Sequence, residues 1–207
     1  MWNDLIERHP SLDGCKDDIA RALEIMTECY KNGGKILLCG NGGSAADCEH
    51  IVGELLKDFL IKRPLSDELR ADMRKRGPDI SDETLDMLQL GLPAISLPSI
   101  VGFNTAFCND RSAELVYAQG VMSLGKPGDV LIAISTLGNA KNVLRAAEVA
   151  KGLGLSLIGL TGMGGGALST LCDSSVRVPE CETYKIQELH IAVYHYLCAM
   201  LEKCFFG

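Results

Sequence analysis

The chain lacks the features that mark several large classes of protein. Its 207 residues contain no apolar run near the roughly 20 residues that a membrane-spanning helix requires. The first ten residues, Met1 to Pro10, are polar and lack the apolar core of a signal peptide. The 20 basic residues are outnumbered by 27 acidic ones, and no basic stripe is long enough to follow a nucleic-acid backbone. We therefore expect a cytoplasmic protein that binds neither membranes nor, directly, nucleic acid.

Several short motifs are also missing. The turn after the first predicted strand contains neither GxGxxG nor Gly-Lys-Ser/Thr, which argues against dinucleotides and P-loop nucleotides. No GxSxG elbow occurs, so serine-based acyl transfer has little support. None of the nine cysteines forms a CxxC pair, and Cys29, Cys39, Cys108 and Cys198 lie in apolar surroundings. We expect free, buried thiols in a reducing compartment.

What the chain does contain is a repeated strand, glycine turn and helix. Apolar runs at 35–39, 129–135 and 155–161 are each followed by a glycine-rich turn and a helical pattern. Such repeats indicate parallel crossover units with helices on both faces of a sheet. The predicted fold is a three-layer α/β/α sandwich with a parallel sheet, and 1–207 is expected to form one domain, since 47% of its residues are hydrophobic.

Helical and charged segments surround these units. Helical spacing predicts an N-terminal helical segment within 1–34 and one long helix over 183–204. Between Lys62 and Gly91 the chain carries six basic and seven acidic residues, which predicts a charged helical insertion, interpreted either as a lid or as a surface excursion without function.

Two of the glycine turns are candidate anion sites. In open parallel sheets, ligands lie at the carboxyl ends of the strands. The turn from Gly40 to Ser44 offers backbone amides free of Cβ atoms and a hydroxyl at a helix start, which suits a phosphate. The second turn supplies two more hydroxyls, from Ser135 and Thr136. We predict that the two turns bind an oxyanion together.

Four side chains on two predicted helices could carry chemistry. His50 and Glu54 are four residues apart, about 40° around a helix, and Gln187 and His195 are eight apart, about 80° around another. Imidazole, carboxylate and amide oxygen together can complete the shell of zinc or another divalent metal. The same groups could transfer protons, as exchange between an aldose and a ketose requires, and the spacing leaves both uses open. His190, alone on an apolar face, is interpreted as a hydrogen-bonded core histidine.

Five motifs occur in the order typical of one family. They read GNGGSAADCEHIVGEL, ND at 109–110, GDVLIAISTLGNAKNV, LIGLTGMGGG and TYKIQELHIAVYHYLC. The chain thus resembles the phosphoheptose isomerase branch of the sugar isomerase (SIS) domain family over nearly its whole length outside the insertion. The resemblance implies a homotetramer with active sites near subunit contacts, and isomerisation of sedoheptulose 7-phosphate to D-glycero-D-manno-heptose 7-phosphate.

The resemblance also assigns roles to individual residues. It implies that the sugar phosphate is lined by Asn41, Gly42, Gly43, Ser44, Asn109 and Asp110. His50, Glu54, Gln187 and His195 match the family's zinc and active-site positions, with Gln187 also facing substrate. Glu54 is then the expected base and His195 the expected acid.

One loop departs from the family pattern. Where relatives read S-T-S-G-N-S, this chain has Leu137 and Ala140 in place of two hydroxyls. Each lost hydrogen bond to a dianionic phosphate would cost about 1.5 to 3 kcal/mol. Lys141 follows, and is expected to be solvated. Two alternatives therefore stay open: a non-catalytic sugar-phosphate sensor or scaffold, like the replication-initiator-associating relatives, and an isomerase of a different sugar.

Overall fold

The computed structural model describes residues 1–77 and 79–207, and its centre is a five-stranded parallel sheet. The strand order is β2-β1-β3-β4-β5, so the predicted α/β/α sandwich is confirmed. The strands are β1 (Ile36–Cys39), β2 (Ala94–Ser96), β3 (Val130–Ile134), β4 (Ser156–Gly162) and β5 (Ser174–Val178). The chain runs outward in opposite directions from the pair β1 and β3, which makes their carboxyl ends the switch point of the sheet.

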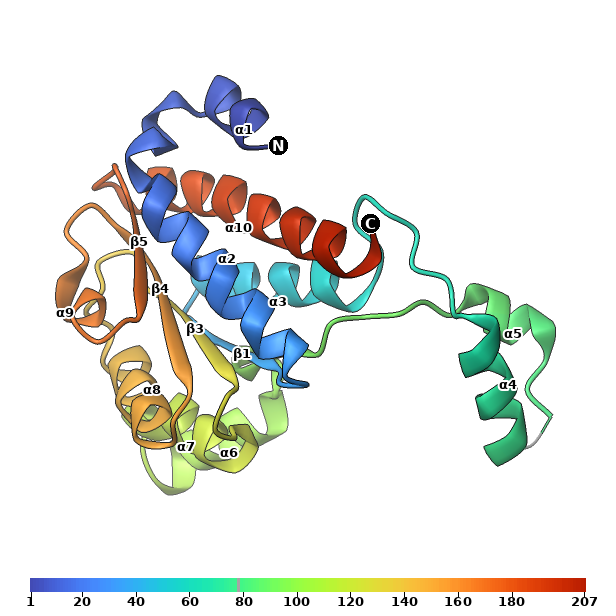
Figure 1. Ribbon diagram of the computed structural model, residues 1–207. Coiled ribbons are helices and arrows are strands. Elements are labelled where there is room, and N and C mark those ends of the chain that lie inside the picture. Colours follow the sequence, from blue (N-terminus) through green and yellow to red (C-terminus); the bar gives the residue numbers. More distant parts are fainter. Residues whose placement is uncertain (78) are drawn as a thin grey trace.

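Helices cover both faces of the sheet (Figure 1). One face carries α2 (Lys16–Lys31), α3 (Gly43–Leu56) and α10 (Thr183–Phe206), and the other carries α6 (Val101–Asp110), α7 (Val116–Leu124) and α8 (Lys141–Gly152). Strand residues alternate between the two cores: Leu38 and Ile132 pack towards α2 and α10, whereas Leu37 and Leu131 pack towards α7 and α8. The shorter elements are α1 (Trp2–Arg8), η1 (Pro10–Cys15), η2 (Leu97–Ser99), η3 (Ala113–Leu115) and α9 (Gly166–Ser169).

The two long helices of the first face follow from their sequence patterns. Asp17 and Asp18 lie in the first turn of α2, where their negative charges interact favourably with the helix dipole. After the end of the helix the chain turns away through Gly33, at φ +74°. In α10 the predicted apolar positions Ile186, Val193 and Leu197 are buried in the core. Helices α2 and α10 pack on each other within this chain, through the apolar face of each helix.

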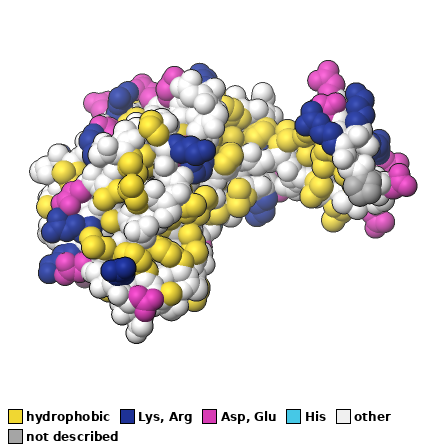
Figure 2. All heavy atoms as spheres, turned by 90° about the horizontal axis from the view of Figure 1, so that it is seen from below, with side chains coloured by type: hydrophobic (Ala, Val, Ile, Leu, Met, Phe, Trp, Pro, Cys, Tyr) yellow, Lys and Arg dark blue, Asp and Glu magenta, His cyan; other side chains and the backbone are white. Residues whose placement is uncertain are grey.

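The charged segment forms an arm that projects away from the sheet (Figure 1). It consists of α4 (Asp67–Arg76) and α5 (Asp82–Met87), capped by the hydroxyls of Ser66 and Ser81, which accept hydrogen bonds from Leu69 and Thr84 amides. An isolated antiparallel bridge between Pro64 and Gln89 joins the outgoing and returning segments. Figure 2 shows charged side chains at the outer end of the arm and hydrophobic ones along its stem.

A buried ion pair anchors the arm to the domain. The side chains of Arg63 and Glu202 are both 0% exposed and meet at 2.9 Å between Nε and Oε1. The Glu202 carboxylate accepts three further hydrogen bonds, from the backbone amides of Phe59, Leu60 and Ile61. Arg63 also donates to the carbonyl oxygens of Leu55 and Glu54, at 2.7 and 3.0 Å. The ion pair therefore joins the root of the arm to the end of α3 and to α10.

The structure corrects two smaller predictions. All nine cysteines are free, as predicted, but Cys108 is exposed rather than buried, because it lies on the solvent side of α6. The helical pattern after the third glycine turn, over 167–172, forms a shorter helix than its sequence indicates, because α9 ends at Ser169 and Thr170 is its C-cap. Among the described residues, no helix combines the length and the apolar character that crossing a membrane requires.

Candidate active site

The turns after β1 and β3 meet at the switch point of the sheet. The side-chain amides of Asn41 and Asn142 donate to each other reciprocally, both at 2.9 Å, and so bridge the two turns. Tyr117 donates its hydroxyl to the Gly40 carbonyl at 2.8 Å. A cavity of about 340 Å³ opens beside this bridge, lined by Asn41, Ala113, Glu114, Ala140, Lys141 and Asn142.

The first turn has the features that an anion site needs. Gly42 adopts φ +56°, which favours glycine, and α3 begins at the next residue. A Cβ atom at Gly43 would overlap the amide of Gln187, so the last helix lies directly over this turn. Ser44 is buried at the helix start, with 4% of its surface exposed. Backbone amides, a hydroxyl and the helix N-terminus thus face the same edge of the sheet.

The second turn is braced by the turn after β4. Asn139 accepts a hydrogen bond from the Ala167 amide at 3.0 Å, and a Cβ at Gly138 would overlap the Gly165 carbonyl. Ser135 is buried, whereas Leu137 is 64% exposed and lines a small cavity of about 170 Å³ together with Met163. An exposed apolar side chain therefore stands where the family resemblance led us to expect a hydroxyl.

Three of the four predicted chemical side chains converge between α3 and α10. The Nε2 atoms of His50 and His195 are 3.3 Å apart, and His50 Nε2 is 3.2 Å from Glu54 Oε1. Ligand-type atoms of all three residues lie within 4.8 Å of one another. The other Glu54 oxygen, Oε2, is 3.4 Å from Lys57 Nζ. We call His50, Glu54 and His195 the histidine–glutamate cluster.

The donor set of this cluster fits a divalent metal. Zinc–nitrogen bonds of about 2.0–2.1 Å at tetrahedral angles place two donors about 3.3–3.4 Å apart. The 3.3 and 3.2 Å separations in the cluster match that spacing. Burial and the neighbouring His50 lower the pKa of His195, which favours the neutral imidazole that metals bind. Two histidines and one carboxylate leave a further position for a substrate or water.

The remaining predicted residues lie around the two turns and the histidine–glutamate cluster. Gln187 lies over Gly43, two turns before His195 on the same helix. Asn109 and Asp110 end α6, are exposed, and bond to each other at 2.9 Å. Lys141 is exposed, as predicted, and pairs with Glu114 at 2.9 Å. The assignment of Gln187, Asn109 and Asp110 to substrate stays a prediction.

His190 is the core histidine that the sequence indicated. It is 0% exposed, and its Nε2 lies 3.3 Å from the Thr161 carbonyl. Burial lowers its pKa to about 4, so the ring is neutral. It belongs to the packing of α10 on the sheet.

Sequence reasoning missed four polar residues near the site: Asp47, Tyr117, Asn142 and Tyr194. Asp47 lies three residues before His50 on α3, a spacing that could have indicated a partner on the same face. Tyr194 approaches His50 Nδ1 at 2.9 Å from the other helix. Tyr117 and Asn142 had no such signal, because only the fold brings them to Asn41.

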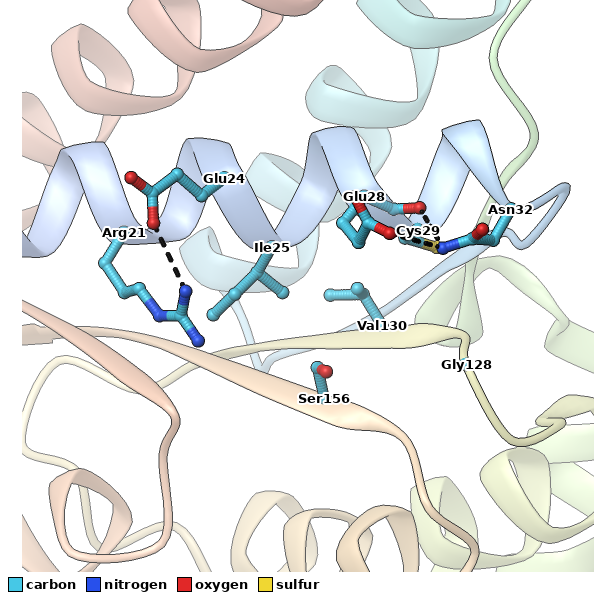
Figure 3. A pocket seen from close by; sticks show the side chains of 9 residues that line it. All are labelled: Arg21, Glu24, Ile25, Glu28, Cys29, Asn32, Gly128, Val130 and Ser156. Carbon is cyan, nitrogen blue, oxygen red and sulfur yellow. Dashed lines mark hydrogen bonds and ion pairs between the residues drawn. The ribbon is translucent and has the colours of Figure 1, made fainter.

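A second hollow lies at the opposite edge of the sheet. Figure 3 shows this cavity of about 360 Å³ between α2 and the first residues of β3 and β4, Val130 and Ser156. Its polar side chains are occupied locally, since Arg21 pairs with Glu24 at 3.2 Å and Asn32 donates to Glu28. It lies at the amino ends of the strands, away from the turns and the histidine–glutamate cluster.

Glycine turns and a helix N-terminus at the switch point of a parallel sheet are typical of α/β domains that bind anionic ligands. The chain belongs to the SIS domain family, whose model matches residues 9–85 and 87–162. Within that family it is similar to phosphoheptose isomerases. The enzymes of Rhodospirillum rubrum and Trichlorobacter lovleyi are each 39% identical, over 92% and 91% of this chain and 88% and 83% of theirs.

Solved structures give the same relationship. The phosphoheptose isomerase from Francisella tularensis superposes with a TM-score of 0.78 and 31% identity, over 98% of this chain and 94% of that one. The phosphoheptose isomerase from Neisseria gonorrhoeae gives 0.74 and 30%, over 97% and 94%. Both therefore share the fold of this chain.

Proposed function

We infer that the chain is an aldose–ketose isomerase that converts sedoheptulose 7-phosphate into D-glycero-D-manno-heptose 7-phosphate. The observation that carries this inference is the histidine–glutamate cluster, which places a carboxylate and two imidazoles together beside the switch point. The names and high coverage of the similar phosphoheptose isomerases support the substrate.

The reaction moves one hydrogen between adjacent carbons. A base removes the proton from the carbon next to the ketose carbonyl, which gives an enediolate, and the proton then returns to the former carbonyl carbon. We assign the carbon-bound proton to the Glu54 carboxylate and the proton exchange between the two oxygens to the His195 imidazole. Lys57 Nζ lies 3.4 Å from Glu54 Oε2, so a positive charge stands beside the candidate base.

We propose that a divalent metal, with zinc the expected ion, is held by His50, Glu54 and His195. Gln187 is the candidate for a further oxygen donor. Such an ion would polarise the substrate oxygens and stabilise negative charge on the enediolate. The two carboxylate oxygens of Glu54 allow one to face the ion while the other handles the proton.

For the phosphate we propose the turns at the switch point. The Gly42 and Gly43 backbone, Ser44, Ser135 and Thr136 supply amides and hydroxyls. Asn41 is already oriented towards the second turn through Asn142. Asn109 and Asp110 remain candidates for the sugar hydroxyls.

The test is an assay of zinc-loaded protein with sedoheptulose 7-phosphate, following interconversion by NMR. The Glu54→Gln variant should lose turnover by about 10²- to 10⁴-fold because the base is gone. Glu49→Gln, on the same helix but outside the histidine–glutamate cluster, is the matched control and should stay active. A fully active Glu54→Gln protein would refute the assignment, and binding without turnover in the unaltered protein would favour the non-catalytic sensor.

A second variant examines the altered turn. Leu137→Ser restores one hydroxyl beside Thr136 and should lower the KM for the phosphorylated sugar by about 10-fold or more, since a hydrogen bond to a charged group contributes about 1.5 to 3 kcal/mol. Leu137→Ala is the control, because it removes the side chain without adding a donor. Equal KM values for the two variants would show that the phosphate does not contact this position.

We also propose that the protein is a homotetramer. The arm extends away from its own domain and exposes Met87, at 79%, and Leu60 beside its root is exposed at 65%. Exposed apolar side chains on a projecting element favour contact with another subunit. Sedimentation equilibrium should give four times the 22.3 kDa chain mass, and a monomer would contradict the proposal.

A further inference from the structure

The nitrogen of His50 that faces away from the histidine–glutamate cluster has its own partner. Its Nδ1 atom is 2.9 Å from the hydroxyl of Tyr194 on α10. The same hydroxyl lies 3.4 Å from Asp47 Oδ1 on α3. Tyr194 is 2% exposed and Asp47 7% exposed, so solvent has little access to this chain of groups. The three residues form a continuous path from a buried carboxylate to a cluster imidazole.

The direction of the hydrogen bonds in this path follows from Asp47. Its second oxygen, Oδ2, is buried and has no hydrogen-bond partner within the described part of the chain. A tyrosine hydroxyl has a single proton. If Tyr194 donated that proton to His50, Asp47 Oδ1 would lose its hydrogen bond from the tyrosine, and Oδ2 already has none within the described part of the chain. Leaving buried carboxylate oxygens unpaired is costly. The favoured arrangement is therefore Tyr194 donating to Asp47 and accepting from His50 Nδ1–H.

This direction decides which tautomer His50 adopts. With the proton on Nδ1, the lone pair of the neutral ring is on Nε2. Nε2 is the atom that lies 3.3 Å from His195 and 3.2 Å from Glu54. The Tyr194 ring also packs edge-on against both imidazoles, with centroids 5.3 Å from His50 and 5.1 Å from His195. The ring fixes their position and the hydroxyl fixes the proton.

We propose that Tyr194 is a positioning residue, which with Asp47 as its acceptor holds His50 in the Nδ1–H tautomer and presents the Nε2 lone pair to a metal ion. The proposal rests on the metal site proposed above. Metal-binding histidines usually donate their second nitrogen to a carboxylate, a carbonyl or a water, and loss of that partner typically weakens binding 10- to 100-fold. Here a tyrosine hydroxyl stands between the carboxylate and the ring.

The test measures zinc affinity of the full-length protein by competition with a chromophoric chelator. Tyr194→Phe keeps the ring and removes the hydroxyl, and should weaken zinc binding by about 10- to 100-fold. Tyr30→Phe is the matched control, because Tyr30 is also buried and donates to a carbonyl, that of Pro93, at 3.3 Å. The control should lose some stability and keep its zinc affinity. Equal affinities in the unaltered protein and Tyr194→Phe would overturn the proposal.

A second measurement separates this proposal from the metal site itself. Nitrogen-15 NMR of the metal-free protein should show His50 as the Nδ1–H tautomer, and Tyr194→Phe should lose that preference. If the unaltered protein bound no zinc, the metal site would be refuted, while the tautomer would still decide the role of Tyr194. An Nε2–H tautomer in the unaltered, metal-free protein would contradict the positioning role whatever the zinc result.

Discussion

Helices α3 and α10 are connected by two polar groups of residues that differ in how completely they are satisfied. In the buried ion pair, Glu202 accepts four hydrogen bonds and both side chains are 0% exposed. In the histidine–glutamate cluster, His50 Nε2 faces His195 Nε2 at 3.3 Å and Glu54 Oε1 at 3.2 Å, and the His50 side chain is 43% exposed. The comparison indicates that saturated polar contacts hold the helices together, whereas unsaturated ones keep the capacity to bind a ligand.

The two groups are nevertheless physically linked. Arg63 of the ion pair donates to the backbone carbonyl of Glu54, whose side chain belongs to the histidine–glutamate cluster. The saturated pair therefore fixes the backbone that presents the candidate base. The predictions below separate stability from chemistry across this link, from the largest expected effect to the smallest.

Replacing Glu202 with Ala should have the largest effect on folding. It leaves the Arg63 guanidinium buried without its counter-charge, which typically costs about 3–5 kcal/mol of unfolding free energy. Urea denaturation followed by circular dichroism measures the loss. Glu188→Ala, at an exposed position of the same helix, should change stability by less than about 0.5 kcal/mol. A loss in Glu202→Ala no greater than in this control would contradict the structural role.

Replacing His195 with Gln should have the opposite profile. Turnover should fall by about 10²- to 10⁴-fold, because the candidate acid and one metal donor are lost. The unfolding free energy of the metal-free protein should change by less than about 1 kcal/mol, since the side chain is only partly buried. His9→Gln serves as the control for both measurements. If His195→Gln unfolded as readily as Glu202→Ala, the distinction between the two groups of residues would fail.

Acid should remove the stabilisation that the buried ion pair provides. Burial alone would raise the pKa of Glu202, but hydrogen bonds from Phe59, Leu60 and Arg63 outweigh it and lower the pKa below its usual 4.5. A lowered pKa means that this stabilisation is complete above pH 4.5 and is lost as the pH falls through the folded-state value. The free energy of unfolding, measured by urea denaturation, should therefore fall more steeply between pH 6 and 3 in the unaltered protein than in Glu202→Gln. Parallel curves would exclude Glu202 as the source.

Removing the outer arm should have the smallest effect on the domain. Residues 66–88 can be replaced by a short Gly/Ser linker that leaves Arg63 in place. The arm packs few buried side chains, and its ion pairs, such as Arg74 with Asp82, are largely exposed. We expect the unfolding free energy of the monomer to change by less than about 1 kcal/mol. A loss as large as that of Glu202→Ala would show that the arm is part of the core.

The strands and helices were predictable where burial is continuous. β1 and β3 are uninterrupted apolar runs, and β4 is largely apolar, because all three strands are covered on both faces. β2 and β5 were missed because they are the edges of the sheet: β2 has three residues, and β5 reads SSVRV with Arg177 facing solvent. Their sequences carry too little of the apolar pattern.

The parts of the site that could be predicted are those whose residues are close together in the sequence. His50 and Glu54 lie on one helix, so their spacing alone brought them together. The approach of His195 was supported only by resemblance, because helix packing determines it. Arg63 and Glu202 are 139 residues apart, and no local pattern could pair them. The role of Tyr194 depends on a hydroxyl direction that sequence does not carry.

The bridge between Pro64 and Gln89 also has a practical consequence. It brings the two ends of the arm side by side, so that the arm is connected to the rest of the domain through two adjacent segments. Segments whose ends are adjacent and whose tips are exposed accept foreign sequence without disturbing the fold. The outer arm is thus a suitable insertion site, where a fluorescent protein or affinity tag could be placed within the chain without altering either terminus.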